Sequence, residues 1–115
     1  MTTYVNSALF VYSEKTEALL EPLQNNNFGT QLNAISFDSL LLNPQASLEG
    51  VEHVIIAGTL VETKAVFSLA LEYDFSLALI PEKNEKKLIK FFNLPKEVDK
   101  SIELACREDS LAIDL

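Results

Sequence analysis

The sequence predicts an α/β protein with one doubly wound, mainly parallel sheet and helices on both faces. Two apolar runs, residues 54–56 and 75–80, lack polar alternation, as expected of strands buried on both faces. Helical patterns follow the predicted strands, and strands joined by helical crossovers pair in parallel. The length of 115 residues suits a single domain spanning residues 1–115.

The first half of the chain predicts two strands and two short helices. Residues 7–12 (SALFVY) form a compact apolar run rich in strand-forming residues. Ser13 is in position to cap the helix that follows, and Pro22 is expected to kink or end that helix. The further expectations here are a more exposed strand over residues 32–37, a short helix over 37–42 and an irregular connection over 43–50.

The second half is organised around residues 53–62 (HVIIAGTLVE), which combine a buried strand, a turn of small residues and the start of a helix over 60–72. The helical face expected to pack on the sheet consists of Val61, Ala65, Val66 and Leu69. Pro81 is expected to end the strand at 75–80. The remaining expectations are a helix over 86–92, a helix with Val98, Ile102, Ala105 and Cys106 on its apolar face, and a final strand over 111–115.

The composition excludes several classes of function. A net charge of −8, from 17 acidic and 9 basic residues, repels nucleic acid and anionic lipid. No apolar run approaches the roughly 18 residues of a membrane-spanning helix, and the N-terminus lacks the basic stretch of a secretion signal. The single Cys106 rules out an internal disulfide and fits a reducing compartment. We therefore expect a cytoplasmic protein that has no nucleic-acid partner and no transmembrane segment. A homodimer is a further alternative, which the composition leaves open.

One basic cluster stands out against this acidic background. Residues 83–90 (KNEKKLIK) carry four lysines and one glutamate. They predict either a solvated helix face or an edge that faces phosphate.

The turn in residues 53–62 is the candidate site. Ala57, Gly58 and Thr59 lie between a buried strand and a helix, an arrangement that presents free backbone N–H groups to phosphate. Thr59 is equally suited to cap the helix, and Glu62 is favoured in a first helical turn by the dipole. Asn84 follows the next strand, and is expected either to contact a ligand or to make a turn. Ligands of such sheets bind beyond the carboxyl ends of the strands.

Other reactive residues predict no site. His53 has no second His, Cys or Asp at ligand spacing, so we expect no metal there. Cys106 falls on an apolar helix face and is expected to be a small core residue. One histidine is insufficient to assemble a nucleophilic triad with these neighbours.

Several segments of the second half follow one another as in a known family. The strand and turn VIIAGT lead into a helix opening LVE, a second strand reads LALIP, the segment NLPKEVDKSIELA follows, and AIDL closes the chain. In this order, residues 51–115 resemble the nucleotide-binding catalytic domain of diacylglycerol kinases and related lipid kinases, which shares its fold with NAD kinases. The matching motif positions are Gly58, Thr59, Leu60, Glu62 and Pro81.

The resemblance implies that ATP with Mg²⁺ is held at Ala57, Gly58, Thr59, Glu62 and Asn84. Of the family's GGDGT turn only Ala57, Gly58 and Thr59 remain, with residues missing and no aspartate, so no catalytic residue is assigned. The glycine, threonine and acid that follow the second strand in the family are also replaced, and its N-P-x-S-G loop is absent after the first strand. These departures indicate an inherited fold with a weakened or lost site.

Lipid kinases of this type carry a β-sandwich domain after the closing strand, and the sequence ends before it. The chain is then either a fragment of a longer protein, which its ending on an apolar strand favours, or a natural single-domain remnant. In both cases the resemblance implies that it meets a lipid substrate only together with a second domain. Two functions follow as hypotheses. One is the nucleotide-binding half of a lipid kinase, degenerate and inactive on its own. The alternative is a non-catalytic α/β module for binding or interaction.

Overall fold

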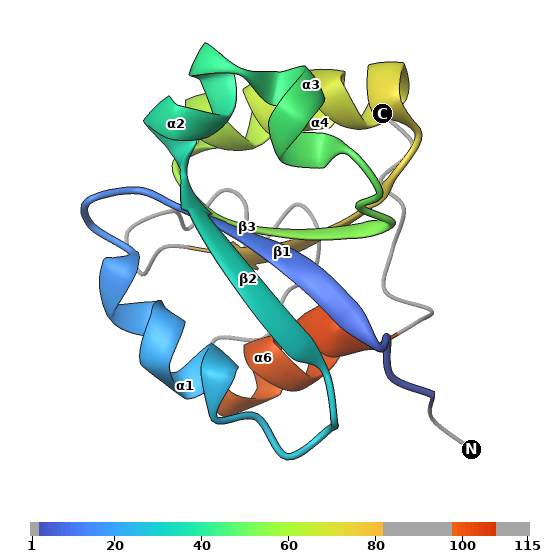
Figure 1. Ribbon diagram of the computed structural model, residues 1–115. Coiled ribbons are helices and arrows are strands. Elements are labelled where there is room, and N and C mark those ends of the chain that lie inside the picture. The colour runs from blue at the N-terminus through green and yellow to red at the C-terminus, as the bar shows by residue number, and fades with distance from the viewer. Residues whose placement is uncertain (1–2, 82–97, 108–115) are drawn as a thin grey trace.

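The computed structural model describes residues 3–81 and 98–107. They form a four-stranded sheet with helices on both of its faces (Figure 1). In chain order the elements are β1 (Ser7–Tyr12), the short 3₁₀ helix η1 (Glu17–Leu19), α1 (Leu20–Gln24), β2 (Gln31–Ser36), α2 (Phe37–Leu42), α3 (Pro44–Leu48), β3 (His53–Gly58), α4 (Leu60–Tyr73), β4 (Ser76–Pro81) and α6 (Val98–Cys106).

The sheet is parallel throughout, with the strand order β2-β1-β3-β4. Helices α1 and α6 cover one face, where they pack on β1 and β3 side chains such as Phe10 and Ile55. Helices α2, α3 and α4 cover the other face, over side chains such as Val11 and Ile56. All six residues of β3 are buried, which explains why its sequence shows no polar alternation. The predicted fold class, a doubly wound α/β sheet, is confirmed.

Most predicted elements are present, with small shifts at their ends. β1 and α2 have the predicted bounds, whereas β2 begins and ends one residue earlier than residues 32–37. The shift arises because the Ser36 hydroxyl accepts a hydrogen bond from the Ser39 amide and caps α2. Ile102, Ala105 and Cys106 of α6 are buried as predicted. The helix predicted over 86–92 and the strand over 111–115 lie outside the described residues.

The predicted start of the first helix is wrong. Ser13 does not cap it; instead, Ser13 and Thr16 form a turn in which the Thr16 amide donates to the Ser13 carbonyl at 3.0 Å. Helical structure begins at Glu17 and continues as α1. Pro22 is tolerated because it lies in the first turn of α1, where its missing N–H has no helical partner to lose. α1 ends two residues later.

The connection over residues 43–50 is not irregular as predicted. It contains α3, with Pro44 as its first residue. The Asn43 side chain accepts a hydrogen bond from the Ala46 amide at 3.4 Å and caps this helix. Asparagine at the cap followed by proline is a favoured way to begin a helix, so the Asn-Pro pair marked a helix start as well as a break.

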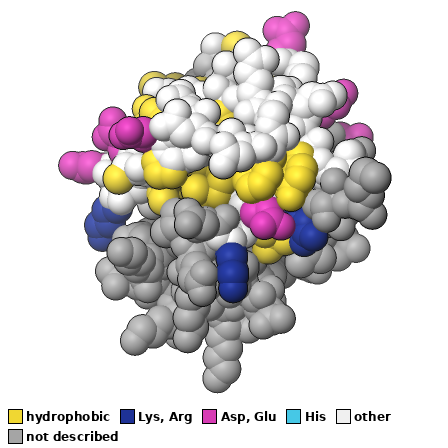
Figure 2. All heavy atoms as spheres, turned by 90° about the horizontal axis from the view of Figure 1, so that it is seen from below, with side chains coloured by type: hydrophobic (Ala, Val, Ile, Leu, Met, Phe, Trp, Pro, Cys, Tyr) yellow, Lys and Arg dark blue, Asp and Glu magenta, His cyan; other side chains and the backbone are white. Residues whose placement is uncertain are grey.

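Hydrophobic side chains also reach the surface, and Figure 2 shows a band of them across the face seen from below. On α4, Val61 was predicted to pack on the sheet, but its side chain is 76% exposed. Thr63 and Val66 are the buried positions of this helix. Apolar residues occur on more than one side of α4, so their spacing did not define a single inward face.

Candidate functional site

A cleft of about 320 Å³ lies at the carboxyl ends of β1, β2 and β3. The chain passes from β1 to β2 on one side of the sheet and places β3 on the other, so the strand order reverses here. Such a switch point is where doubly wound sheets bind ligands. The residues that line the cleft are Tyr12, Ser13, Glu14, Lys15, Ser36, Phe37, Asp38, Thr59 and Glu62.

The turn between β3 and α4 forms one wall of the cleft through Thr59 and Glu62. Thr59 is the N-cap residue of α4: its hydroxyl accepts a hydrogen bond from the Glu62 amide at 3.2 Å. In return, Glu62 Oε1 accepts a hydrogen bond from the Thr59 amide at 2.9 Å, which completes a capping box. The Thr59 N–H is therefore satisfied within the protein by a carboxylate.

Gly58 makes room for that carboxylate. Its backbone lies outside the left-handed region, so its conformation does not require glycine. A Cβ atom built on Gly58 would lie 2.6 Å from Glu62 Oε1, which is closer than the two atoms can approach. A side chain at this position would therefore require the Glu62 carboxylate, which folds back over Gly58, to move.

The roles of Gly58 and Glu62 predict a coupling between the two residues. Gly58→Ala should displace the Glu62 carboxylate and reduce the free energy of unfolding by about 0.5–2 kcal/mol, as loss of a cap does. In a Glu62→Ala background the same substitution should cost almost nothing, because the space is then empty. Urea unfolding of the two single variants and the double variant measures the coupling. Additive effects would show that the carboxylate is not held over Gly58.

The other predicted site residues have different positions. The Ala57 side chain is fully buried in the core on the α1 and α6 face, so it does not face the cleft. Its carbonyl accepts a hydrogen bond from the Thr16 hydroxyl at 2.8 Å. Asn84 lies outside the described residues, as do residues 83–90. The structure thus brings Thr59 and Glu62 to the cleft, with Gly58 supporting Glu62.

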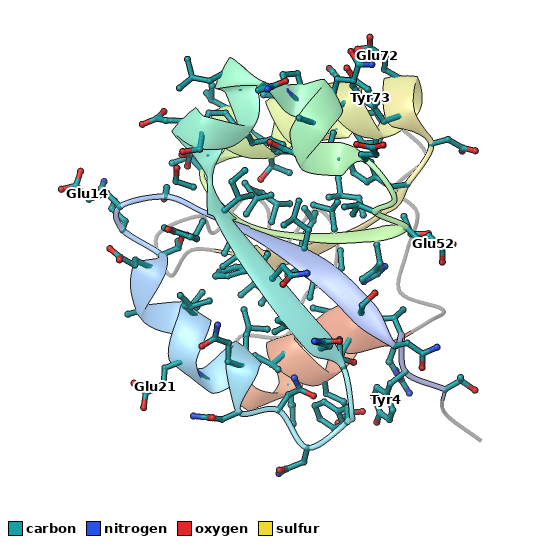
Figure 3. All side chains as sticks on the ribbon, in the orientation of Figure 1. Tyr4, Glu14, Glu21, Glu52, Glu72 and Tyr73 are labelled. Atoms are coloured by element: carbon teal, nitrogen blue, oxygen red, sulfur yellow. The ribbon has the colours of Figure 1, made fainter. Side chains whose placement is uncertain are left out.

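The contribution of the loop after β1 was missed in the sequence. Thr16 anchors this loop: it is 3% exposed, donates to the Ala57 carbonyl and accepts a hydrogen bond from the Ser13 amide at 2.9 Å. Lys15 and Glu14 are thereby held beside the cleft, with Glu14 extending outward from the loop (Figure 3). The sequence did contain a signal for these residues, because Glu14 and Lys15 directly follow a predicted strand. The carboxyl ends of parallel strands meet at one edge of the sheet, so residues after such a strand lie near the candidate site.

The described lining of the cleft is predominantly acidic. Glu14, Asp38 and Glu62 line it together with one cation, Lys15. Within residues 3–81 and 98–107, no cluster of three or more His, Cys, Asp or Glu side chains is suited to hold a metal ion. The described lining therefore offers an anion little compensating positive charge.

His53 lies at the opposite end of β3 and has a structural role. It is 3% exposed, and its Nε2 is 2.7 Å from the Ala105 carbonyl in α6. Since a carbonyl only accepts, Nε2 carries the proton of the neutral ring. Burial lowers the pKa of His53, and the smaller effect of the hydrogen bond to Ala105 raises it. The imidazole thus joins β3 to α6 in its neutral form.

This lowered pKa predicts a pH dependence of stability. Above pH 6.5, the ordinary pKa of histidine, both states are neutral at this position. As the pH falls below that value, the unfolded chain binds a proton that the folded chain resists, so the free energy of unfolding should decrease by up to about 1.4 kcal/mol per pH unit. Comparing urea unfolding of the wild type and His53→Gln between about pH 6.5 and 5, above the carboxylate range, isolates the effect. If the free energy of unfolding of the two proteins changed equally with pH, the predicted contribution of His53 would be contradicted.

The fold and the cleft define a doubly wound α/β protein with a cleft at its topological switch point. No protein-family model, curated protein or solved structure matches the chain. Among the described residues, none of the helices is long and apolar enough to cross a membrane.

Proposed function

We propose that this chain is a non-catalytic α/β module, related to the nucleotide-binding half of lipid kinases, that does not hold ATP on its own. The observation that supports this proposal is the 2.9 Å hydrogen bond from the Thr59 amide to Glu62 Oε1. The Thr59 N–H, one of the backbone donors at this turn, is already bonded to a carboxylate.

The charge of Glu62 also opposes the binding of a phosphate at this turn. The start of α4 carries the positive end of the helix dipole, which attracts anions, and Glu62 already occupies this region. A phosphate entering the turn must either displace the carboxylate or lie beside a like charge. Phosphoryl transfer also depends on metal ions and positioned charges that neutralise the γ-phosphate. Among the described residues that line the cleft, Lys15 is the one cation.

A retained nucleotide site is the second candidate. The position of the cleft at the switch point and the presence of Lys15 favour it. In this case ATP with Mg²⁺ would occupy the cleft between the loop after β1 and the start of α4, and Glu62 would move aside. A lipid substrate would require a further domain.

Calorimetric titration with ATP, with and without Mg²⁺, and with NADP(H) distinguishes the candidates. The wild type is expected to show no saturable heat at millimolar nucleotide. Glu62→Gln is the informative variant, because glutamine keeps the capping geometry while removing the charge. Gly58→Val is a poor control, since its side chain would displace Glu62 and expose the turn.

Each outcome separates the two candidates. Binding by Glu62→Gln but not by the wild type would support blockage by the carboxylate. Absence of binding in both would support a module that has lost its nucleotide chemistry altogether. Saturable binding by the wild type that disappears in Lys15→Ala would overturn the proposal in favour of the retained site.

A further inference from the structure

The edge strand β2 lacks the features that usually prevent edge strands from pairing with other chains, namely charge, proline and bulges. Its six residues, QLNAIS, include no charged residue and no proline. It pairs with β1 without a bulge, from Ser7↔Gln31 to Tyr12↔Ser36. None of its residues is fully buried. At the other edge of the sheet, residues 77–80 of β4 are all buried.

The backbone of β2 presents unused hydrogen-bonding groups away from β1. The Gln31 amide donates to the Asn6 carbonyl at 2.8 Å, so Gln31 directs its backbone groups toward β1. Because backbone direction alternates along a strand, Leu32 and Ala34 direct their N–H and C=O groups outward. Within the described part of the chain, no strand pairs with this side of β2.

The charge distribution favours contact between two copies at this edge. Residues 22–37 contain no Asp, Glu, Lys, Arg or His, and this is the longest such stretch in the sequence. With a net charge of −8, two copies repel each other over most of their surfaces. Strand β2 lies at the front of the molecule in Figure 1. Figure 2 shows the molecule from below, and the part of its surface that belongs to this front is largely uncharged.

We propose that two copies of this chain associate through β2, antiparallel and about a twofold axis, so that their sheets join into one. A twofold axis makes such an edge self-complementary, since each outward N–H of one copy meets a C=O of the other. Ala34, which has the smallest side chain of the outward-facing residues, lies opposite its own counterpart. A contact of six residues per strand is a small interface, so the dimer is weak and exchanges with monomer. This inference is independent of nucleotide binding.

Sedimentation equilibrium from low micromolar to near-millimolar protein tests the proposal. The wild type should shift from monomer to dimer across this range. Ala34→Pro should remain monomeric, because it removes an outward N–H while leaving the bonds to β1 intact. Asn33→Lys provides a second variant, with an exposed side chain at the same edge. Its control is Gln45→Lys on α3, which changes the net charge equally at a distant exposed position and should leave dimerisation unchanged.

A cross-linking experiment tests the register. Ala34→Cys should form a disulfide-linked dimer under mild oxidation, because directly opposed residues in an antiparallel pair lie within disulfide distance. Gln45→Cys should not, and the native Cys106 is buried. A wild type that stays monomeric throughout, or a dimer that survives in folded Ala34→Pro and Asn33→Lys, would overturn the proposal. If circular dichroism shows that neither variant folds, the cross-link decides: its presence supports the β2 interface, and its absence overturns it.

Discussion

Replacing Phe10 with alanine is expected to reduce the free energy of unfolding by about 3–5 kcal/mol. Phe10 is fully buried in β1, which lies between β2 and β3. It belongs to the same core cluster as Leu23 of α1 and Ile102 of α6, so removing its ring leaves a cavity in the core on the side of the sheet that these helices cover. Small domains are stable by about 5–15 kcal/mol in total. The variant is therefore expected to be partly unfolded at moderate temperature.

Urea unfolding followed by circular dichroism measures this effect, since the chain contains no tryptophan for fluorescence. Val61→Ala is the matched control, because its side chain is largely exposed and its removal should change stability by less than about 0.5 kcal/mol. A loss smaller than about 1 kcal/mol for Phe10→Ala would show that this ring is not part of a tightly packed core.

The second large effect is expected for Thr16→Val. The substitution keeps the shape of the side chain but removes the hydroxyl that donates to the Ala57 carbonyl and accepts from the Ser13 amide. Loss of these two hydrogen bonds at a buried position should cost about 1–3 kcal/mol. It should also release the loop after β1 from the end of β3, so the cleft should lose its fixed wall.

Two measurements check this expectation. Urea unfolding gives the loss of stability, and hydrogen exchange should show faster exchange of the Ser13 amide in Thr16→Val than in the wild type. Thr16→Ser keeps the hydroxyl and should retain most of the stability and the slow exchange. Equal behaviour of the valine and serine variants would contradict a role for these hydrogen bonds.

The buried strands of the sheet were predictable because burial determines which residue types a strand contains. A strand covered on both faces must be apolar throughout, so β3 and β4 could be recognised from their residues alone. The start of the first helix could not be predicted from the sequence, because Ser13 and Thr16 are both able to cap a helix. The outcome depends on Thr16 bonding to Ala57, a partner 41 residues away in the sequence. Such long-range contacts override local propensity.

The candidate site was predictable in location but not in composition. The strand, small turn and helix at residues 53–62 correctly indicated where the carboxyl edge lies. The walls contributed by Lys15 and Asp38 depend on β1 lying between β2 and β3, and strand order is not readable from local patterns. Glu62 was recognised as a candidate, but its contact with Thr59 required the folded turn.

The Glu62 carboxylate behaves as a tethered competitor for its own helix terminus. A group held by a short chain segment acts at an effective concentration of roughly millimolar or more, so a free anion must exceed that to replace it at the Thr59 amide. A ligand that displaces Glu62 would therefore need additional contacts elsewhere in the cleft, and the turn would disfavour small free anions at lower concentrations.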